Sequence, residues 1–251
     1  MKNIYRWLRI NKLSLNINKT SIIIFDQNEN LDAILVEIDQ NFTAVIIECK
    51  TQKYFGLMME HKLKFSEHID YIKKKISKRI GAMYRSKKIL PLKYRKMFAN
   101  ALMLPQFDYL DIIWYKANVT KLNELDLMYK KVAIIALDVN IRESTVTVYK
   151  TMKWLPFHIR RQLHLATYMY RIINGLSPKK IMNKFAYISG GSRDGNSCNL
   201  YTNKSRTHKE FYYLRAKCWN LLPQPLRNIE NTKNFSDIDK KQLLAQLYNK
   251  R

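Results

Sequence analysis

Short runs of β-branched and aromatic residues dominate the chain between positions 20 and 59. Three such runs, at 21–25, 34–38 and 43–47, are separated by short polar stretches. Apolar runs of this length, bounded by polar residues that favour turns, are typical of β-strands. The pattern therefore predicts a small antiparallel sheet in the N-terminal part of the chain.

The hydrophobic period becomes helical beyond His68. Apolar residues from Ile69 to Met83 recur at spacings of three and four, which places them on one side of a helix, and lysines and arginines project from the opposite side. The same period predicts further helices at about 92–103, 121–137 and 158–174. We therefore expect an α+β fold in which the small sheet is followed by a mainly helical region.

One stretch rich in glycine, serine and asparagine interrupts this pattern, at about 189–206. It has no hydrophobic period and is typical of a loop or linker. The sequence thus divides into residues 1–60, which form the strand-rich region, a helical region at 61–188, the linker at 189–206 and a small helical segment at 207–251.

Charge is distributed unevenly between these regions. The 251 residues include 45 Lys and Arg against 20 Asp and Glu, a net charge of +25. Residues 1–60 contain seven basic and seven acidic residues, so the whole excess lies after residue 60. Such an excess indicates a polyanionic partner, with nucleic acid as the first choice and an anionic membrane surface as the second. Because the apolar helix stripes should be used up in a core, we expect no membrane partner.

The hydrophobic content and the cysteines bear on whether the chain folds and on the compartment in which it resides. Hydrophobic residues make up 47% of the chain, enough to bury a core. No apolar run approaches the roughly 18 residues of a membrane-spanning helix, and the basic N-terminus lacks the apolar core of a secretory signal. Three scattered cysteines, Cys49, Cys198 and Cys218, form no metal-binding pair. We expect an intracellular protein of the nucleus or cytoplasm that is not secreted.

Several motifs occur in an order that is familiar from one family. They include Asn-Lys-Leu-Ser-Leu-Asn-Ile-Asn-Lys-Thr at 11–20 before the apolar run 21–25, Tyr-Phe-Gly-Leu at 54–57, Leu-Pro at 90–91, Leu-Pro at 155–156 with Arg160 and Arg161, Ile-Ile-Asn-Gly-Leu-Ser-Pro at 172–178, and Trp-Asn-Leu-Leu-Pro at 219–223. In this order and spacing they resemble the end of the palm, the thumb and the post-thumb region of reverse transcriptases from jockey-like non-LTR retrotransposons.

The resemblance implies roles for particular residues. Residues 1–60 would be a remnant of the palm and residues 61–188 a thumb-like region. Tyr54, Phe55 and Gly56 would form a primer-grip-like turn, and Lys19 would approach the phosphates of an incoming nucleotide if the full polymerase existed. From the residues alone, the simpler interpretation of Lys19 is a solvated lysine before a strand, and the aromatic pair is equally part of an ordinary strand in a core.

Polymerase chemistry itself is not expected of this chain. The family holds its Mg²⁺ ions with a motif that contains two adjacent aspartates, and no two acidic residues are adjacent anywhere in this sequence. The chain resembles the family from just after that motif, so we expect the fingers, metal site and most of the palm to lie outside it. Asp108 and Asp111 are one helical turn apart and are not expected to replace the pair. We therefore predict no catalytic residue, no metal ligand and no cofactor here, with Mg²⁺ implied only for the full-length enzyme.

Binding is the activity that the sequence predicts. Candidate phosphate ligands are the basic residues on and after the first long helix, namely Lys74, Lys75, Lys78, Arg85, Lys87 and Lys88. They would hold an RNA or DNA duplex by its phosphates without reading bases. A cationic helix side is also often a plain solvated face. Two origins stay open beside an inactive polymerase fragment, namely a binding or interaction module retained by a host and a decayed reading frame. The sequence assigns no oligomeric state.

Overall fold

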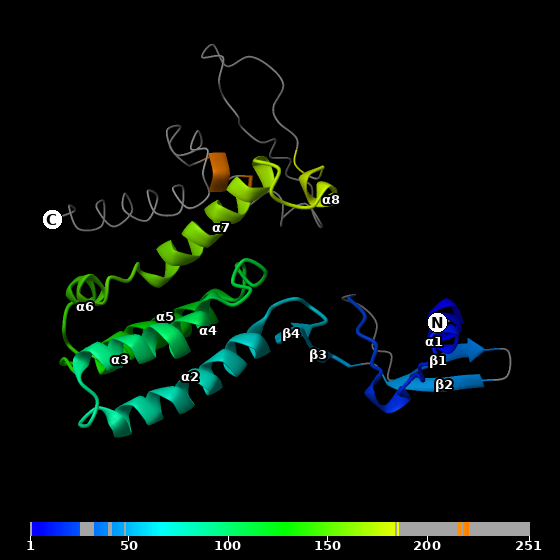
Figure 1. Cartoon of the computed structure of the whole chain (residues 1–251), viewed down its shortest axis with the longest axis horizontal. Coiled ribbons are helices and arrows are strands. Elements are labelled where there is room, and N and C mark those ends of the chain that lie inside the picture. The colour runs from blue at the N-terminus through cyan, green and yellow to red at the C-terminus, as the bar shows by residue number, and fades with distance from the viewer. Residues whose placement is uncertain are drawn as a thin grey trace, which may run out of the picture. The chain divides into compact units, whose positions relative to one another are not determined.

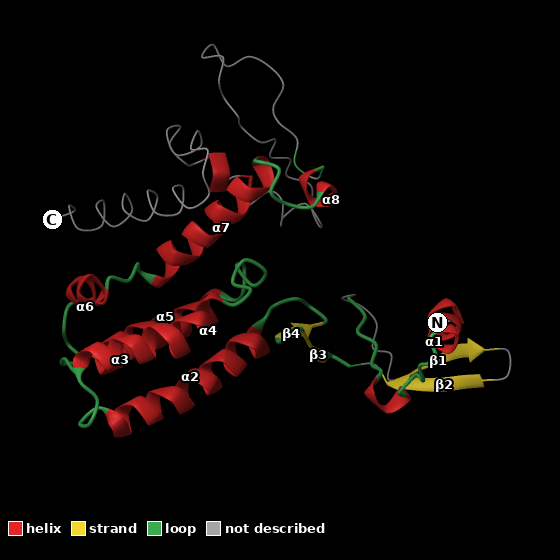
Figure 2. Ribbon diagram, viewed as in Figure 1, coloured by secondary structure: helices red, strands yellow, loops and turns green. Residues whose placement is uncertain are grey.

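The described part of the chain is mainly helical, with antiparallel strand pairs near its N-terminus (Figures 1 and 2). The computed structural model describes residues 2–25, 33–39, 42–47, 49–183, 185, 215, 216 and 218–220. A small sheet followed by a helical region is thus confirmed.

Two of the three predicted strands are confirmed. Strand β1 (Ala33–Asp39) pairs with β2 (Phe42–Ile47) in antiparallel register, with Ala33 opposite Ile47. The predicted strand at 21–25 is wrong, because this segment has only a single bridge, in which the Cys49 N–H donates to the Ile22 carbonyl at 2.8 Å. An apolar run becomes a strand only where a neighbour continues the ladder of hydrogen bonds.

A second antiparallel hairpin follows directly. Strand β3 (Thr51–Tyr54) pairs with β4 (Leu57–Glu60), and Tyr54 lies opposite Leu57. The two residues between the strands have positive φ angles, 45° at Phe55 and 82° at Gly56. Positive φ at both positions is the requirement of the type I′ turn, which matches the natural twist of a hairpin.

Two long helices carry the periods seen in the sequence. Helix α2 (Ser66–Ser86) buries its apolar stripe, and Ile69, Ile76 and Met83 are fully enclosed. Helix α5 (Val119–Leu137) begins after Asn118, whose side-chain oxygen accepts a hydrogen bond from the Thr120 N–H at 2.9 Å. This bond satisfies one of the amide groups that a helix start leaves without a partner.

The helix expected at 92–103 is more complex than its period indicates. Helix α3 (Leu92–Phe98) passes into a π-helical turn, η2 (Ala99–Met103), and then into α4 (Leu104–Asp108). Helix α7 (Phe157–Ile173) confirms the last predicted helix. The sequence did not predict four short elements, α1 (Lys2–Ile10), the 3-10 turn η1 (Ile17–Lys19), α6 (Thr145–Met152) and α8 (Lys179–Met182).

The chain forms two compact units. The first contains Met1–Lys78 and Lys116–Leu125, and the second contains Arg79–Tyr115 and Asp126–Arg251. Residue 60, the end of the expected palm-like region, lies inside the first unit. The expected linker at 189–206 lies outside the described residues, as does most of 207–251.

An aromatic cluster around Tyr129 forms part of the core of the second unit. Its ring centroid lies 4.9 Å from that of Trp154 and 5.1 Å from that of Phe107, and the rings of Tyr149 and Phe157 are each 5.5 Å away. The Tyr129 hydroxyl donates to the Leu155 carbonyl at 3.0 Å. The pairs with Phe107 and Tyr149 are edge-to-face, an arrangement that stabilises a core beyond the area that it buries.

Candidate nucleic-acid interface

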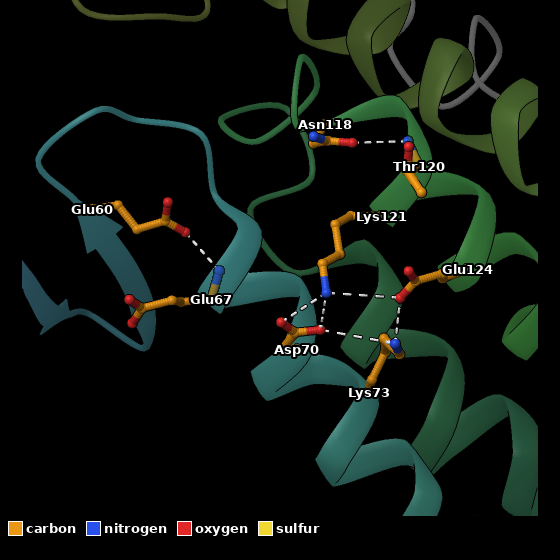
Figure 3. Close-up of polar contacts among 8 residues, drawn as sticks. All are labelled: Glu60, Glu67, Asp70, Lys73, Asn118, Thr120, Lys121 and Glu124. Atoms are coloured by element: carbon orange, nitrogen blue, oxygen red, sulfur yellow. Dashed lines mark hydrogen bonds and ion pairs between the residues drawn. The ribbon is translucent and has the colours of Figure 1, made fainter.

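Carboxylates in the first unit are engaged by a network between α2 and the start of α5 (Figure 3). Lys121 Nζ lies 2.8 and 2.9 Å from the two carboxylate oxygens of Asp70, and Lys73 pairs with Glu124. Each acidic group of this network therefore has a lysine beside it.

The remaining two carboxylates near the start of α2 are also engaged. The Glu60 carboxylate accepts a hydrogen bond from the Glu67 N–H at 2.6 Å, which caps the helix (Figure 3). The Glu67 carboxylate accepts one from the Thr51 hydroxyl at 2.9 Å. These contacts join the β3–β4 hairpin to α2 at its first turn.

The predicted phosphate ligands Lys74, Lys75 and Lys78 are placed differently. Lys74 and Lys78 are exposed and Lys75 is half-buried. Within the described residues, none of the three has a carboxylate within 4.0 Å, whereas Lys73 next to them does. The sequence from 71 to 107 contains 11 basic residues and no acidic one. This side of α2 therefore carries positive charge that carboxylates do not neutralise.

Tyr71 connects two of these cations, a contact that the sequence did not predict. Lys53 Nζ of β3 donates to the Tyr71 hydroxyl at 3.0 Å and lies 5.0 Å from the ring centroid. Lys75 Nζ lies 4.5 Å from the same centroid. Hydrogen bonds from Lys53 and Lys75 lower the pKa of the Tyr71 hydroxyl. The only signal in the sequence was the i, i+4 spacing of Tyr71 and Lys75.

The tip of the hairpin presents aromatic rings to solvent. Tyr54 is 62% exposed and Phe55 is 75% exposed, and their ring centroids lie 4.4 Å apart in an edge-to-face arrangement. The interpretation of this pair as part of a buried strand is therefore wrong. Gly56 supplies the second positive φ of the turn, and the β3 strand places Lys53 next to the tip.

The other predicted ligands lie in the second unit. Arg85 and Lys88 are exposed. Lys87 Nζ lies 2.7 Å from Asp138, and this pairing raises the pKa of Lys87 and lowers the pKa of the Asp138 carboxyl. Its charge is thus partly neutralised within the fold.

Lys19 is an exposed residue at the end of η1. Its backbone N–H donates to the Asn16 side chain at 3.2 Å. This hydrogen bond positions the backbone of Lys19 and not its ammonium group, and among the described residues no carboxylate lies within 4.0 Å of that group.

Asp108 and Asp111 do not act as a pair. Both oxygens of Asp108 accept from the Arg160 guanidinium at 2.6 Å, and Asp111 lies 2.6 Å from His164 Nδ1. Each carboxylate thus has its own cationic or imidazole partner on α7. Among the described residues, no group of three His, Cys, Asp or Glu side chains is arranged to hold a metal ion.

His68 lies buried where the hairpin meets α2. Its Nδ1 accepts a hydrogen bond from the Met58 N–H at 3.3 Å. Burial, followed by the nearby charge of Lys75, lowers the pKa of His68 from 6.5 to about 4. The imidazole is therefore neutral at pH 7, and its protonation would oppose both the burial and the acceptor role of Nδ1.

This lowered pKa makes stability depend on pH. Between pH 6.5 and about 4 the unfolded chain binds a proton that the folded chain does not, so the free energy of unfolding falls as the pH falls through this window. We expect a loss of about 2 kcal/mol, since partial solvent screening reduces the full value of the shift. Urea denaturation of the wild type and of His68→Gln at several pH values measures it. The exposed His158→Gln is the matched control and should retain the wild-type pH dependence, and an identical slope in His68→Gln would contradict the expectation.

Comparison with protein-family models, with curated proteins and with solved structures finds no match to this chain. In the part of the chain that the structure describes, no helix is both long enough and apolar enough to cross a membrane. The functional proposal therefore rests on the charges and contacts of the candidate interface.

Proposed function

We propose that this chain binds the phosphate backbone of nucleic acid without reading base sequence. The binding surface is formed by the β3–β4 hairpin and the basic side of α2 in the first unit. Lysines contact phosphates at any sequence, because the phosphate charge is the same at every nucleotide.

The observation that carries this proposal is the division of charge around α2. The carboxylates Asp70 and Glu124 are held by Lys73 and Lys121, whereas Lys53 and the lysines of the basic side have no carboxylate within 4.0 Å among the described residues. A helix face that only contacts water usually carries basic and acidic residues in alternation, as most stable protein surfaces do. Unneutralised positive charge favours an anionic ligand.

The exposed rings at the hairpin tip support the same ligand. Aromatic side chains stack on nucleic-acid bases, and such stacking tolerates any sequence because every base has a π-face. Tyr54 is the last residue of β3 and Phe55 is the first of the two turn residues, and Lys53 precedes both on the same hairpin. They are placed to contact an unpaired base or a duplex end while the lysines contact phosphates.

The resemblance to retrotransposon reverse transcriptases supports a specific origin. On this proposal the chain derives from the end of the palm and the thumb of such an enzyme and holds a primer-template duplex without extending it. The lack of any adjacent acidic pair in the sequence supports binding without polymerisation.

Neutralising three lysines tests the proposed function. We expect Lys74→Gln, Lys75→Gln and Lys78→Gln together to weaken binding of an RNA–DNA duplex about 100-fold at about 0.1 M salt, because each lost phosphate contact also forfeits counterion release. The slope of log affinity against log salt should fall in magnitude by about 2.7. Fluorescence anisotropy of a labelled duplex across a salt series measures both quantities.

The control removes the same charge elsewhere. Lys131→Gln, Lys179→Gln and Lys180→Gln together replace three exposed lysines of the second unit and leave the same net charge. We expect this variant to bind within about threefold of the wild type with a slope changed by less than one. Equal loss in both variants would show that total charge, not this surface, determines binding. Weak binding by the wild type that is indifferent to salt would overturn the proposal.

A further inference from the structure

Two ammonium groups share a single tyrosine ring in the first unit. Lys53 Nζ and Lys75 Nζ approach Tyr71 from different elements, β3 and α2, and both lie within 5.0 Å of its centroid. The Tyr71 hydroxyl lies with them and accepts a hydrogen bond from Lys53 at 3.0 Å. On the same helix, the His68 ring is stacked against Tyr71 with a centroid distance of 6.4 Å.

The neighbouring carboxylates do not offset these cations. Glu67 and Asp70 flank Tyr71 on α2, but Glu67 accepts from Thr51 and Asp70 from Lys121. Within the described residues, neither Lys53 nor Lys75 has a carboxylate within 4.0 Å. Two like charges held against one ring repel each other, and an anion that bound both would offset this repulsion.

We propose that Lys53, Tyr71 and Lys75 form a seat for one phosphodiester oxyanion of a bound nucleic acid. This inference rests on the function proposed above and specifies where a single phosphate lies. Both ammonium groups donate to the anion, and the Tyr71 hydroxyl, which accepts from Lys53, still has its own proton to donate. Three donors from one strand and one helix match the several acceptor oxygens of a phosphate group.

The seat would also set the register of the ligand on the surface. Lys53 and Tyr54 are consecutive residues of β3, so their side chains leave opposite faces of the hairpin. A nucleotide held by its phosphate at Tyr71 would therefore lie on the face of the hairpin opposite the Tyr54 ring. Phosphate contacts of this kind fix orientation and carry no sequence information.

An inorganic anion tests the seat without nucleic acid. The full chain is labelled with ¹³C at the tyrosine Cζ, and the Tyr71 signal is identified as the one missing from Tyr71→Phe. The signal is titrated in sodium sulfate and in sodium chloride of equal ionic strength. We expect sulfate to raise the apparent pKa of Tyr71 by about half a unit, because a bound anion disfavours the phenolate. The exposed Tyr84 and Tyr94 should show no such difference.

Three variants of the site and one control variant test this assignment. The sulfate effect should disappear in Lys53→Gln and in Lys75→Gln, and it should persist in Lys62→Gln, which removes an exposed lysine of the same unit. In duplex binding, Lys53→Gln should lower the magnitude of the salt slope by about 0.9, whereas Tyr71→Phe should weaken binding about fivefold without changing the slope.

The sulfate titration and the duplex-binding measurement test the phosphate site and the proposed function separately. A sulfate effect that is confined to Tyr71, together with the expected loss of duplex affinity, supports the proposal. Duplex binding by the wild type without any sulfate effect at Tyr71 overturns the seat and leaves the proposed function standing. A sulfate effect combined with unchanged duplex binding in Lys53→Gln and Tyr71→Phe would mean an adventitious ion only, and it overturns the assignment to nucleic acid.

Discussion

Replacing Tyr129 by alanine is expected to lower the free energy of unfolding by about 4 kcal/mol. Its fully buried ring contacts four other aromatic rings, those of Phe107, Tyr149, Trp154 and Phe157. Alanine would leave a cavity among these rings, which large side chains refill poorly. Urea denaturation followed by circular dichroism measures the change.

Tyr129→Phe separates packing from hydrogen bonding. It keeps the ring and removes only the hydroxyl that donates to the Leu155 carbonyl at 3.0 Å. We expect a loss of about 1 to 2 kcal/mol, because the buried carbonyl then lacks its donor. The exposed Tyr94→Ala is the control and should change stability by less than about 0.5 kcal/mol. An Ala variant no less stable than the Phe variant would contradict the role of this ring in the core.

Replacing Asp111 by alanine is the second large effect that we expect, a loss of about 3 kcal/mol. Asp111 is buried, lies 2.6 Å from His164 Nδ1, and its charge opposes the lowering of the Arg161 pKa. Arg161 itself is buried among aromatic rings, with its guanidinium carbon 4.7 Å from the Trp114 and Tyr115 centroids. Removing the carboxylate leaves a buried cation without this compensation.

A double-mutant cycle isolates the contact between the two side chains. Asp111→Ala, His164→Ala and the double variant are compared by urea denaturation, and we expect a coupling energy of about 1 to 2 kcal/mol. Asp111→Asn is the matched variant, since it keeps the shape and an acceptor oxygen without the charge. Additive losses in the cycle would show that Asp111 stabilises the fold through other neighbours.

Long periodic helices could be predicted from the sequence, whereas short elements could not. The stripe from Ile69 to Met83 is buried in α2 as its spacing indicates. Helix α6 begins with Thr145, Val146, Thr147 and Val148, residues that favour strands, so tertiary packing decides its conformation. The π-helical turn η2 (Ala99–Met103) hardly changes the spacing of apolar residues, so the hydrophobic pattern of the sequence does not reveal it.

The candidate interface could be predicted only in part for a similar reason. The lysines on the basic side of α2 follow from helical spacing. Whether a carboxylate neutralises a given lysine depends on residues that are distant in sequence. Lys87, for example, pairs with Asp138, which follows it by 51 residues. Lys53 and Tyr71 meet because the hairpin packs on α2, and no local pattern records that contact.

The turn at the tip of β3–β4 has an energetic consequence. Phe55 adopts a φ of 45°, a region in which a side chain without a local hydrogen bond costs about 1 kcal/mol. Asparagine or glycine would occupy the same position with less strain. A phenylalanine there is thus a poor choice for the stability of the hairpin. Under the proposed function, the strained backbone is the energetic cost of exposing an aromatic ring to a base.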